Sequence, residues 1–143
     1  MNQVVVKQEK SGYQIVEAYK SLRTNLQFCG EDKKVIAITS CTPNEGKSSV
    51  SMQLGISLAE IGKRVILIDA DLRKSVLLGR TKTEKSVRGL AHFLSGQASL
   101  EDVICATNIK NFYMIYSGPF PPNPAELLGG KNFRSLLNAL RKV

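Results

Sequence analysis

Apolar residues recur every three or four positions in three stretches of the chain, at residues 13–28, about 47–61 and about 131–142. At that spacing they fall on one side of a helix, so each stretch is predicted to form an amphipathic helix. Gly62 is predicted to end the second of these helices, because glycine readily takes the left-handed conformation that closes a helix.

Two shorter helices are predicted further along the chain. Residues 89–94 form the first, which ends before Gly96. The second begins at Ser99, whose hydroxyl can cap the helix while Asp102, three residues later, returns the contact as its capping-box partner.

Short runs of apolar and often β-branched residues predict strands at residues 35–39, 65–68 and 112–116. The first two runs flank the predicted helix at residues 47–61. This order of strand, helix and strand predicts a βαβ unit, in which both strands are parallel. The expected fold class is therefore α/β, with a mostly parallel sheet and helices on both of its faces.

Three other segments are predicted to lack regular structure. The first ten residues are polar enough to fray, and residues 74–85 are mostly polar and basic, as in a loop. Four prolines at residues 119–124 exclude a central strand there. This proline segment could contact a nucleotide or a partner, or it could act only as a rigid connector.

Length and charge narrow the function classes. The 143 residues suit one domain, spanning residues 1–143, with a single core. The net charge is +8, yet the basic residues are scattered without a run of five. We therefore expect a mixed, solvated surface with a phosphate site and no nucleic-acid partner, while a polyanion-binding face is the alternative.

The three cysteines (Cys29, Cys41 and Cys105) show no paired spacing, which is typical of a reducing compartment. The single histidine, His92, is expected to be structural. No apolar segment resembles a signal peptide or approaches the roughly 20 residues needed to cross a bilayer. The expected location is the cytoplasm, unless a partner tethers the chain.

Residues 41–48 lie between a predicted strand and a predicted helix and fit the phosphate-loop pattern Gly-x4-Gly-Lys-Ser, except that Cys41 replaces the first glycine. Gly46 lets the backbone approach phosphates, Lys47 supplies a charge to the β- and γ-phosphates, and the Ser48 hydroxyl can reach Mg²⁺. The motif taken alone also fits an ordinary turn that starts a helix. The candidate nucleotide-binding residues are Thr42, Pro43, Asn44, Glu45, Gly46, Lys47, Ser48, Ser49 and Arg73.

Two acids, Asp69 and Asp71, follow the predicted strand at residues 65–68. In an open parallel sheet, the carboxyl ends of the strands face the ligand crevice, so these acids are expected beside the phosphate loop. Carboxylates that face a triphosphate repel it unless Mg²⁺ lies between them. Arg73 could orient a phosphate or pair with one of the aspartates. Solvated charges at a strand-ending turn are the alternative.

Residues 65–73 resemble the Walker A′ element of bacterial tyrosine kinases, the P-loop kinases of polysaccharide co-polymerase systems. Residues 17–26, 89–96 and 117–128 also resemble segments of that family. The similarity runs from about Gly12 to the last residue, and it implies a three-layer P-loop NTPase-like fold.

The resemblance implies a protein-tyrosine (auto)kinase that uses ATP and Mg²⁺ and regulates capsular or exopolysaccharide synthesis. It implies a homo-oligomer, protein tyrosine substrates, and a membrane adaptor that holds the kinase at the inner face of the plasma membrane. Its catalytic residues correspond to Lys47, Asp69 and Asp71, and its metal ligands to Ser48 and Asp71. In the mechanism we expect, Asp69 orients or deprotonates the incoming tyrosine hydroxyl.

The family's oligomerisation motif, Glu-x-x-Arg-x-x-Arg, corresponds to Glu17, Lys20 and Arg23, with lysine in place of its first arginine. Lysine cannot make the bidentate pairs that arginine makes. The family's Walker B strand, which ends in Asp-x-x-Pro, would begin just after Val143. The expected fold is therefore incomplete at the C-terminus, and the chain resembles about the first two thirds of the catalytic domain.

Two other function classes stay open. One is an ATP-binding module that regulates assembly or chain length without transferring phosphate itself. The other is a partition or septum-positioning ATPase, although Thr42 stands where those proteins carry an additional lysine. The tyrosines at positions 13, 19, 113 and 116 are candidate phosphoacceptors, and the last three are at spacings typical of packing residues.

Overall fold

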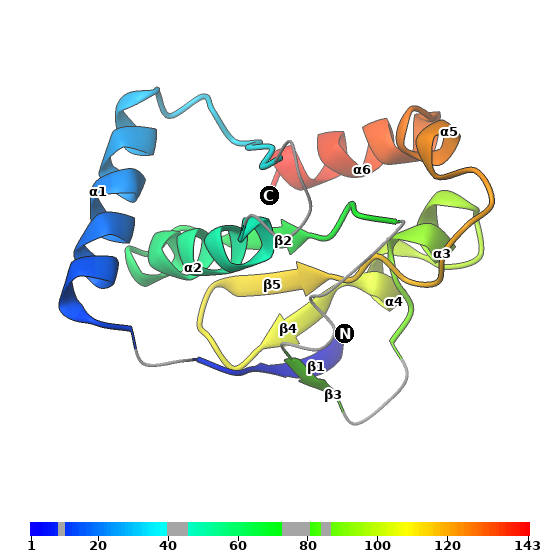
Figure 1. The fold of residues 1–143 in the computed structure, drawn as a ribbon. Coiled ribbons are helices and arrows are strands. Elements are labelled where there is room, and N and C mark those ends of the chain that lie inside the picture. The colour runs from blue at the N-terminus through cyan, green and yellow to red at the C-terminus, as the bar shows by residue number, and fades with distance from the viewer. Residues whose placement is uncertain (9–10, 40–45, 73–80, 84–86) are drawn as a thin grey trace.

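The computed structural model describes residues 1–8, 11–39, 46–72, 81–83 and 87–143, which form an α/β structure (Figure 1). The helices are α1 (Tyr13–Phe28), α2 (Lys47–Glu60), α3 (Leu90–Leu94), α4 (Leu100–Val103), α5 (Pro124–Leu128) and α6 (Lys131–Arg141). The strands are β1 (Asn2–Val6), β2 (Val65–Ile68), β3 (Thr81–Thr83), β4 (Cys105–Thr107) and β5 (Phe112–Ile115). None of the described helices is long and apolar enough to cross a membrane.

The described strands form one sheet in the order β2-β5-β4-β1-β3. The β2–β5 and β1–β4 pairs are parallel, whereas the β4–β5 and β1–β3 pairs are antiparallel. The sheet is therefore mixed, and the expectation of a mostly parallel sheet needs this correction.

Helices cover both faces of the sheet, as the sequence predicts. In β5, Phe112 and Met114 pack into the core cluster that contains Met52 and Ile56 of α2. Ile115, whose side chain points to the opposite face, joins the second cluster. That cluster contains Leu90 and Leu94 of α3, Val103 of α4 and Leu136 of α6. Because successive side chains of a strand point to opposite faces, β5 contributes to both cores.

The N-terminal segment is not frayed, so that prediction was wrong. Residues 2–6 form β1, which lies between β4 and β3. Val4 and Val6 are only 2% and 3% exposed, while Val5 between them is 50% exposed. The alternation that marks a half-buried strand is present, but the partner strand β4 lies about a hundred residues away, and only the tertiary fold brings it there.

Residues 35–39 do not form the buried strand that their apolar run predicts. In the described part of the chain they pair with no strand, and Val35 and Ile36 are 44% and 46% exposed. The described strands therefore do not include the expected βαβ unit. β-propensity needs a neighbouring strand to satisfy the backbone, and the known partner of β2 is β5 instead.

The helical predictions agree closely with the structure. The five predicted helices correspond to α1, α2, α3, α4 and α6, with ends that differ by one residue at most. The capping box of α4 is present: Ser99 N–H donates to Asp102 Oδ2 at 2.9 Å, and Asp102 N–H donates to Ser99 Oγ at 3.3 Å. The hydrogen bond from Ser99 N–H to the carboxylate is the main cause that holds the pKa of Asp102 below its usual value.

The structure adds two elements to segments that were predicted to be loops. α5 begins at Pro124, because proline is favoured in the first turn of a helix, where it loses no hydrogen bond. β3 lies within residues 74–85, and the rest of that segment lies outside the described residues.

Candidate functional site

The amino end of α2 has the features of an anion site. Gly46 precedes the helix in the left-handed conformation, with φ +79°. No described atom lies within 4 Å of the position that a Cβ would take there, and no described side chain caps the helix. The first turn of a helix directs main-chain N–H groups and a partial positive charge outward, which favours phosphate.

The acidic segment after β2 lies at the carboxyl end of that strand. Asp69 N–H donates to the carbonyl oxygen of Ile115 at 2.9 Å, which continues the β2–β5 ladder. The side chain of Asp69 accepts a hydrogen bond through Oδ1 from the N–H of Asp71, two residues later, at 3.1 Å. This bond holds the Asp69 side chain, which is buried at 6% exposed. The Asp71 side chain is more accessible.

The two candidate elements meet in space. Lys47 Nζ lies 3.7 Å from Asp71 Oδ2, and each side chain is 37% exposed. Ion pairs that are this accessible contribute little, about 0–1 kcal/mol. Lys47 can therefore exchange the carboxylate for a bound phosphate at small cost.

The other site residues are placed in part. Ser48 and Ser49 lie in the first turn of α2 and are half-buried. Lys47 also accepts a hydrogen bond through its carbonyl oxygen from Ser51 Oγ at 2.7 Å. The following predicted residues lie outside the described residues: Cys41, Thr42, Pro43, Asn44, Glu45 and Arg73.

A junction beside this site was not predicted. The N–H groups of Leu90 and Ala91 donate to the carbonyl oxygens of Tyr116 and Ser117, at 2.6 Å and 2.9 Å, and tie α3 to the end of β5. Gly89 approaches the backbone of Gly118 so closely that a Cβ at position 89 would overlap the Gly118 nitrogen. The sequence signal that could have indicated this close approach is the glycine at positions 89 and 118.

His92 belongs to the same junction. Its Nδ1 accepts the N–H of Gly89 at 3.0 Å. This bond caps the start of α3, which agrees with the structural role expected for the histidine.

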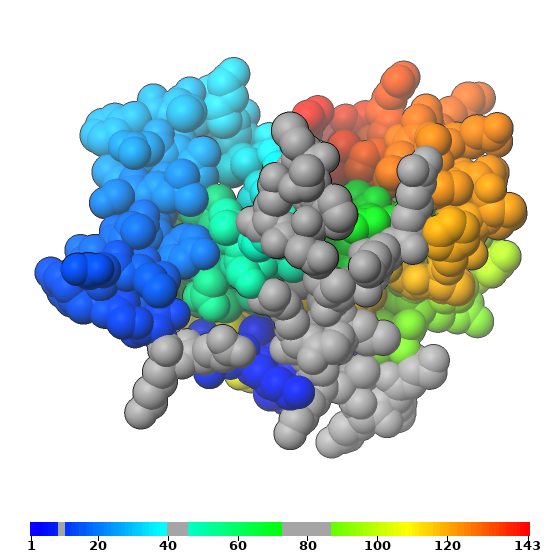
Figure 2. All heavy atoms as spheres, in the orientation of Figure 1, coloured from blue at the N-terminus to red at the C-terminus, as the bar shows by residue number. Residues whose placement is uncertain are grey.

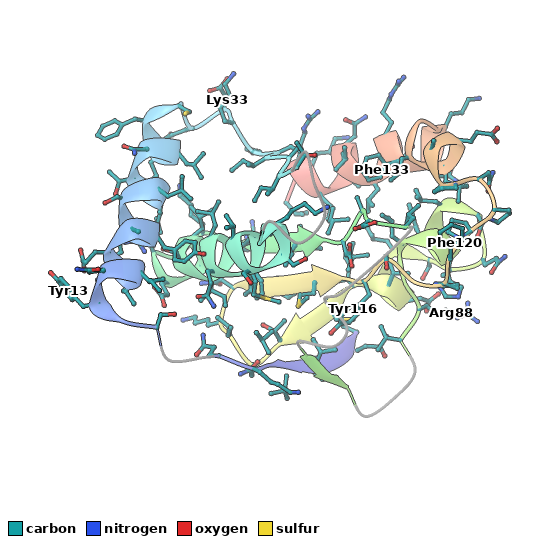
Figure 3. All side chains as sticks on the ribbon, in the orientation of Figure 1. Tyr13, Lys33, Arg88, Tyr116, Phe120 and Phe133 are labelled. Atoms are coloured by element: carbon teal, nitrogen blue, oxygen red, sulfur yellow. The ribbon has the colours of Figure 1, made fainter. Side chains whose placement is uncertain are left out.

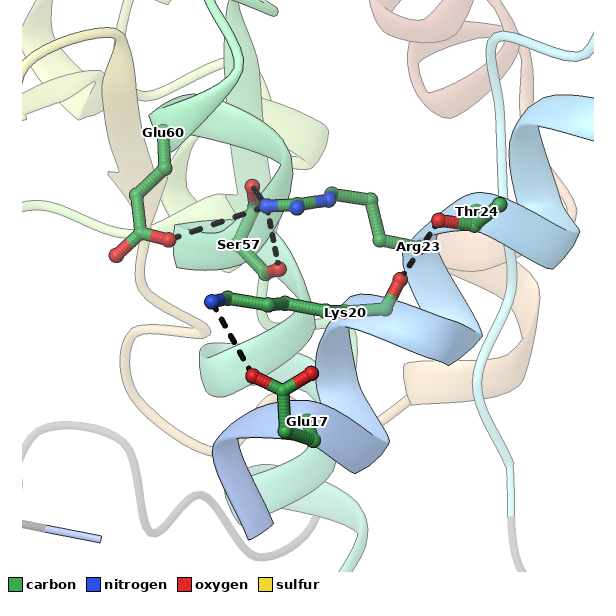
Figure 4. Close-up of polar contacts among 6 residues, drawn as sticks. All are labelled: Glu17, Lys20, Arg23, Thr24, Ser57 and Glu60. Atoms are coloured by element: carbon green, nitrogen blue, oxygen red, sulfur yellow. Dashed lines mark hydrogen bonds and ion pairs between the residues drawn. The ribbon is translucent and has the colours of Figure 1, made fainter. Parts of the chain in front are cut away.

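The predicted oligomerisation residues lie along α1 (Figure 4). Lys20 Nζ donates to Glu17 Oε1 at 3.4 Å, one turn away. Arg23 Nη1 donates to the carbonyl oxygen and the hydroxyl of Ser57 in α2, at 2.8 Å and 3.1 Å, and lies 3.9 Å from Glu60 Oε2. Arg23 therefore joins α1 to α2 within the chain, while Glu17 and Lys20 stay about half exposed.

Other helices lie on both sides of α2. On the face drawn in Figure 2, α1 and the α5–α6 region lie on either side of α2. The amino end of α2 points toward the carboxyl end of β2, so the α1–α2 contact at Ser57 lies at the far end of the helix from Lys47 (Figure 1).

Comparison with known proteins gives consistent matches. Residues 33–139 match the family model described as AAA domain. Tyrosine-protein kinase CpsD of Streptococcus agalactiae is 42% identical over 127 residues, which cover 89% of this chain and 56% of that protein. Tyrosine-protein kinase YwqD of Bacillus subtilis is 43% identical over 122 residues, 84% of this chain and 51% of that protein. The chain thus spans about half the length of the curated relatives it matches.

Solved structures agree with this result. The kinase domain of Escherichia coli tyrosine kinase ETK superposes with a TM-score of 0.82 at 36% identity, over 89% of this chain and 50% of that chain. The VpsO kinase domain superposes with a TM-score of 0.72 at 30% identity, over 92% of this chain and 68% of that chain.

Proposed function

The chain belongs to the AAA domain family and is homologous to bacterial tyrosine kinases, and from this premise we propose that it forms the nucleotide-binding part of an ATP-dependent protein-tyrosine kinase. In this proposal the kinase regulates capsular or exopolysaccharide synthesis. The observation that carries the proposal is the approach of Lys47 to Asp71, which joins the phosphate-loop helix to the acid after β2.

The residues present suit a magnesium nucleotide. The left-handed turn at Gly46 and the start of α2, which no described side chain caps, suit phosphate oxygens. When bound, the magnesium nucleotide supplies a transferable phosphoryl group and a cation that offsets its charge. We assign phosphate contact to Lys47 and metal contact to Ser48 and Asp71.

Asp69 is assigned to the tyrosine substrate. A phenol with a pKa of about 10 is protonated at neutral pH, so a nearby carboxylate can accept its proton or orient it. The hydrogen bond from Asp71 N–H to Oδ1 holds the Asp69 carboxylate in one orientation. Residues 42–45 and Arg73 complete the proposed nucleotide contacts.

Exposure distinguishes the four tyrosines as phosphoacceptors. Tyr13, at the start of α1, is 79% exposed and points away from the body of the molecule (Figure 3). Tyr116 is 3% exposed, and Tyr19 and Tyr113 are half-buried. If the kinase modifies its own chain within these residues, Tyr13 is the accessible acceptor.

Oligomerisation and membrane attachment are also proposals. Because Arg23 bonds to Ser57 of its own chain, we assign it to holding α1 in place. Glu17 and Lys20 then present the exposed side of α1 to a neighbouring subunit. Through a membrane adaptor, the oligomer would lie at the inner face of the plasma membrane.

The test uses the purified chain with labelled ATP. Magnesium-dependent nucleotide binding is measured by calorimetry, and phosphotyrosine is measured on the same sample. Lys47→Met and Asp71→Asn are each expected to weaken magnesium-dependent binding at least tenfold, since each removes a charge from the site. Unchanged affinity in both variants would refute the site.

A second pair of outcomes separates kinase from module. Phosphotyrosine that Asp69→Asn abolishes, while nucleotide binding persists, supports the kinase. Nucleotide binding with no phosphotyrosine in the wild-type chain supports an ATP-binding assembly module instead.

A further inference from the structure

Three pairs of adjacent basic residues, scattered in the sequence, meet around the end of α6. We call this surface the basic edge. It consists of six exposed side chains: Lys33, Lys34, Lys63, Arg64, Arg141 and Lys142.

Two hydrogen bonds hold the three pairs together at the end of α6. Lys34 Nζ donates to the carbonyl oxygen of Arg141 at 3.2 Å, and the Arg64 guanidinium donates to the carbonyl oxygen of Val143. These bonds bring together segments that are about thirty and about eighty residues apart along the chain.

Among the described residues, one acid forms an ion pair with a cation of the basic edge. Asp32 Oδ2 lies 3.4 Å from Lys33 Nζ, but the two side chains are 78% and 63% exposed, so the pair is strongly screened. Figure 3 shows the Lys33 side chain reaching outward from the molecule. Glu60, at the end of α2, is directed to Arg23 instead.

One pair of the basic edge lies at the other end of β2 from the proposed nucleotide site. Lys63 and Arg64 directly precede β2, whereas Asp69 and Asp71 directly follow it. A strand of four residues is roughly 13 Å long. Lys63 and Arg64 therefore lie at a distance from the acids of the proposed site, and a partner can contact this pair without touching those acids.

We propose that the basic edge binds the anionic phospholipid surface of a membrane directly. All six side chains are exposed rather than gathered in a pocket, which suits a diffuse charged surface more than one small anion. Four of the six are lysines, whose ammonium groups act as point charges and need no planar partner. Each cation near an anionic bilayer raises the partition coefficient roughly fivefold.

Sedimentation of the chain with vesicles tests the proposal. One set of vesicles contains phosphatidylcholine alone, and the other also contains phosphatidylglycerol. We expect binding to the second set only, and its loss at high salt, because the Debye length falls to about 3 Å at 1 M.

Variants with matched charge locate the surface. Lys33→Gln with Lys63→Gln removes two cations of the basic edge and spares the contacts with Arg141 and Val143. We expect about thirtyfold weaker binding to anionic vesicles. Lys131→Gln with Arg134→Gln removes the same charge from the opposite end of α6 and should change binding less than about threefold.

Several results would overturn the proposal. The first is an equal loss of vesicle binding in both double variants. The second is equal binding to neutral and anionic vesicles. The third is binding to RNA or polyglutamate without binding to anionic vesicles. Calorimetric nucleotide binding by the Lys33→Gln, Lys63→Gln variant should be unchanged. Failure of the basic edge is thereby distinguished from failure of the proposed nucleotide site.

Discussion

Arg23 is predicted to be the main attachment of α1 to the rest of the chain. None of the sixteen residues of α1, all of which the structure describes, is buried, so apolar packing holds this helix only weakly. The Arg23 side chain is 14% exposed and donates twice to Ser57. Hydrogen bonds from a charged group in such a setting contribute about 1.5–3 kcal/mol.

We therefore expect Arg23→Ala to lower the free energy of opening α1 by about 2 kcal/mol. The ion pair with Glu60 adds little to this value, because its atoms are 3.9 Å apart and Glu60 is 60% exposed. Since α1 can separate without unfolding the sheet, the loss should appear as local opening rather than as a large shift in global stability.

Hydrogen exchange resolved along the chain is the suitable assay. A loss of about 2 kcal/mol makes the amides of α1 exchange roughly thirtyfold faster, while those of β5 change little. Glu60→Gln is the matched control and should leave exchange in α1 within about threefold of the wild type. Unchanged exchange in Arg23→Ala, or an equal effect in Glu60→Gln, would refute the reasoning.

Three further predictions concern the core and the surface. Gly89→Ala should destabilise the fold by about 1–3 kcal/mol in urea unfolding, because its Cβ would overlap the Gly118 backbone. The control Gly12→Ala, which has no described atom within 4 Å of the added Cβ, should change stability by less than about 0.5 kcal/mol. Burial raises the pKa of Cys105 to about 11, so the unfolding free energy should fall as the pH rises above about 9, where only the unfolded thiol ionises. Replacement of Cys105 by alanine should remove that pH dependence. In the presence of ATP and Mg²⁺, Tyr13→Phe should remove most of the phosphotyrosine that mass spectrometry detects on this chain, and an undiminished signal would show that another tyrosine is the acceptor.

Local sequence determined the helices. The apolar spacing of residues 13–28 and 131–142 matches one side of a helix, and the ends of α1 and α6 agree with it within one residue. The capping pair of Ser99 and Asp102 could also be predicted from the sequence, because a capping box joins residues only three positions apart. A helix satisfies its backbone within itself, so a short window of sequence carries the information.

Strands depend on partners that local sequence cannot name. Residues 2–6 form a strand because β4, about a hundred residues later, lies beside them. Residues 35–39 have a stronger apolar pattern and yet pair with no described strand. A strand is stable only when a neighbour accepts its hydrogen bonds, and that neighbour is chosen by the packing of the whole chain.

The same division applies to the surfaces that carry the proposals. The sequence by itself indicated that Lys47 and Asp71 have the right chemistry for a phosphate site, and it showed the basic pairs as scattered charges. The tertiary structure brought Lys47 within 3.7 Å of Asp71 and brought the three basic pairs together around the end of α6. Charges act across space, and distances in space follow from how helices and strands pack rather than from the order of residues.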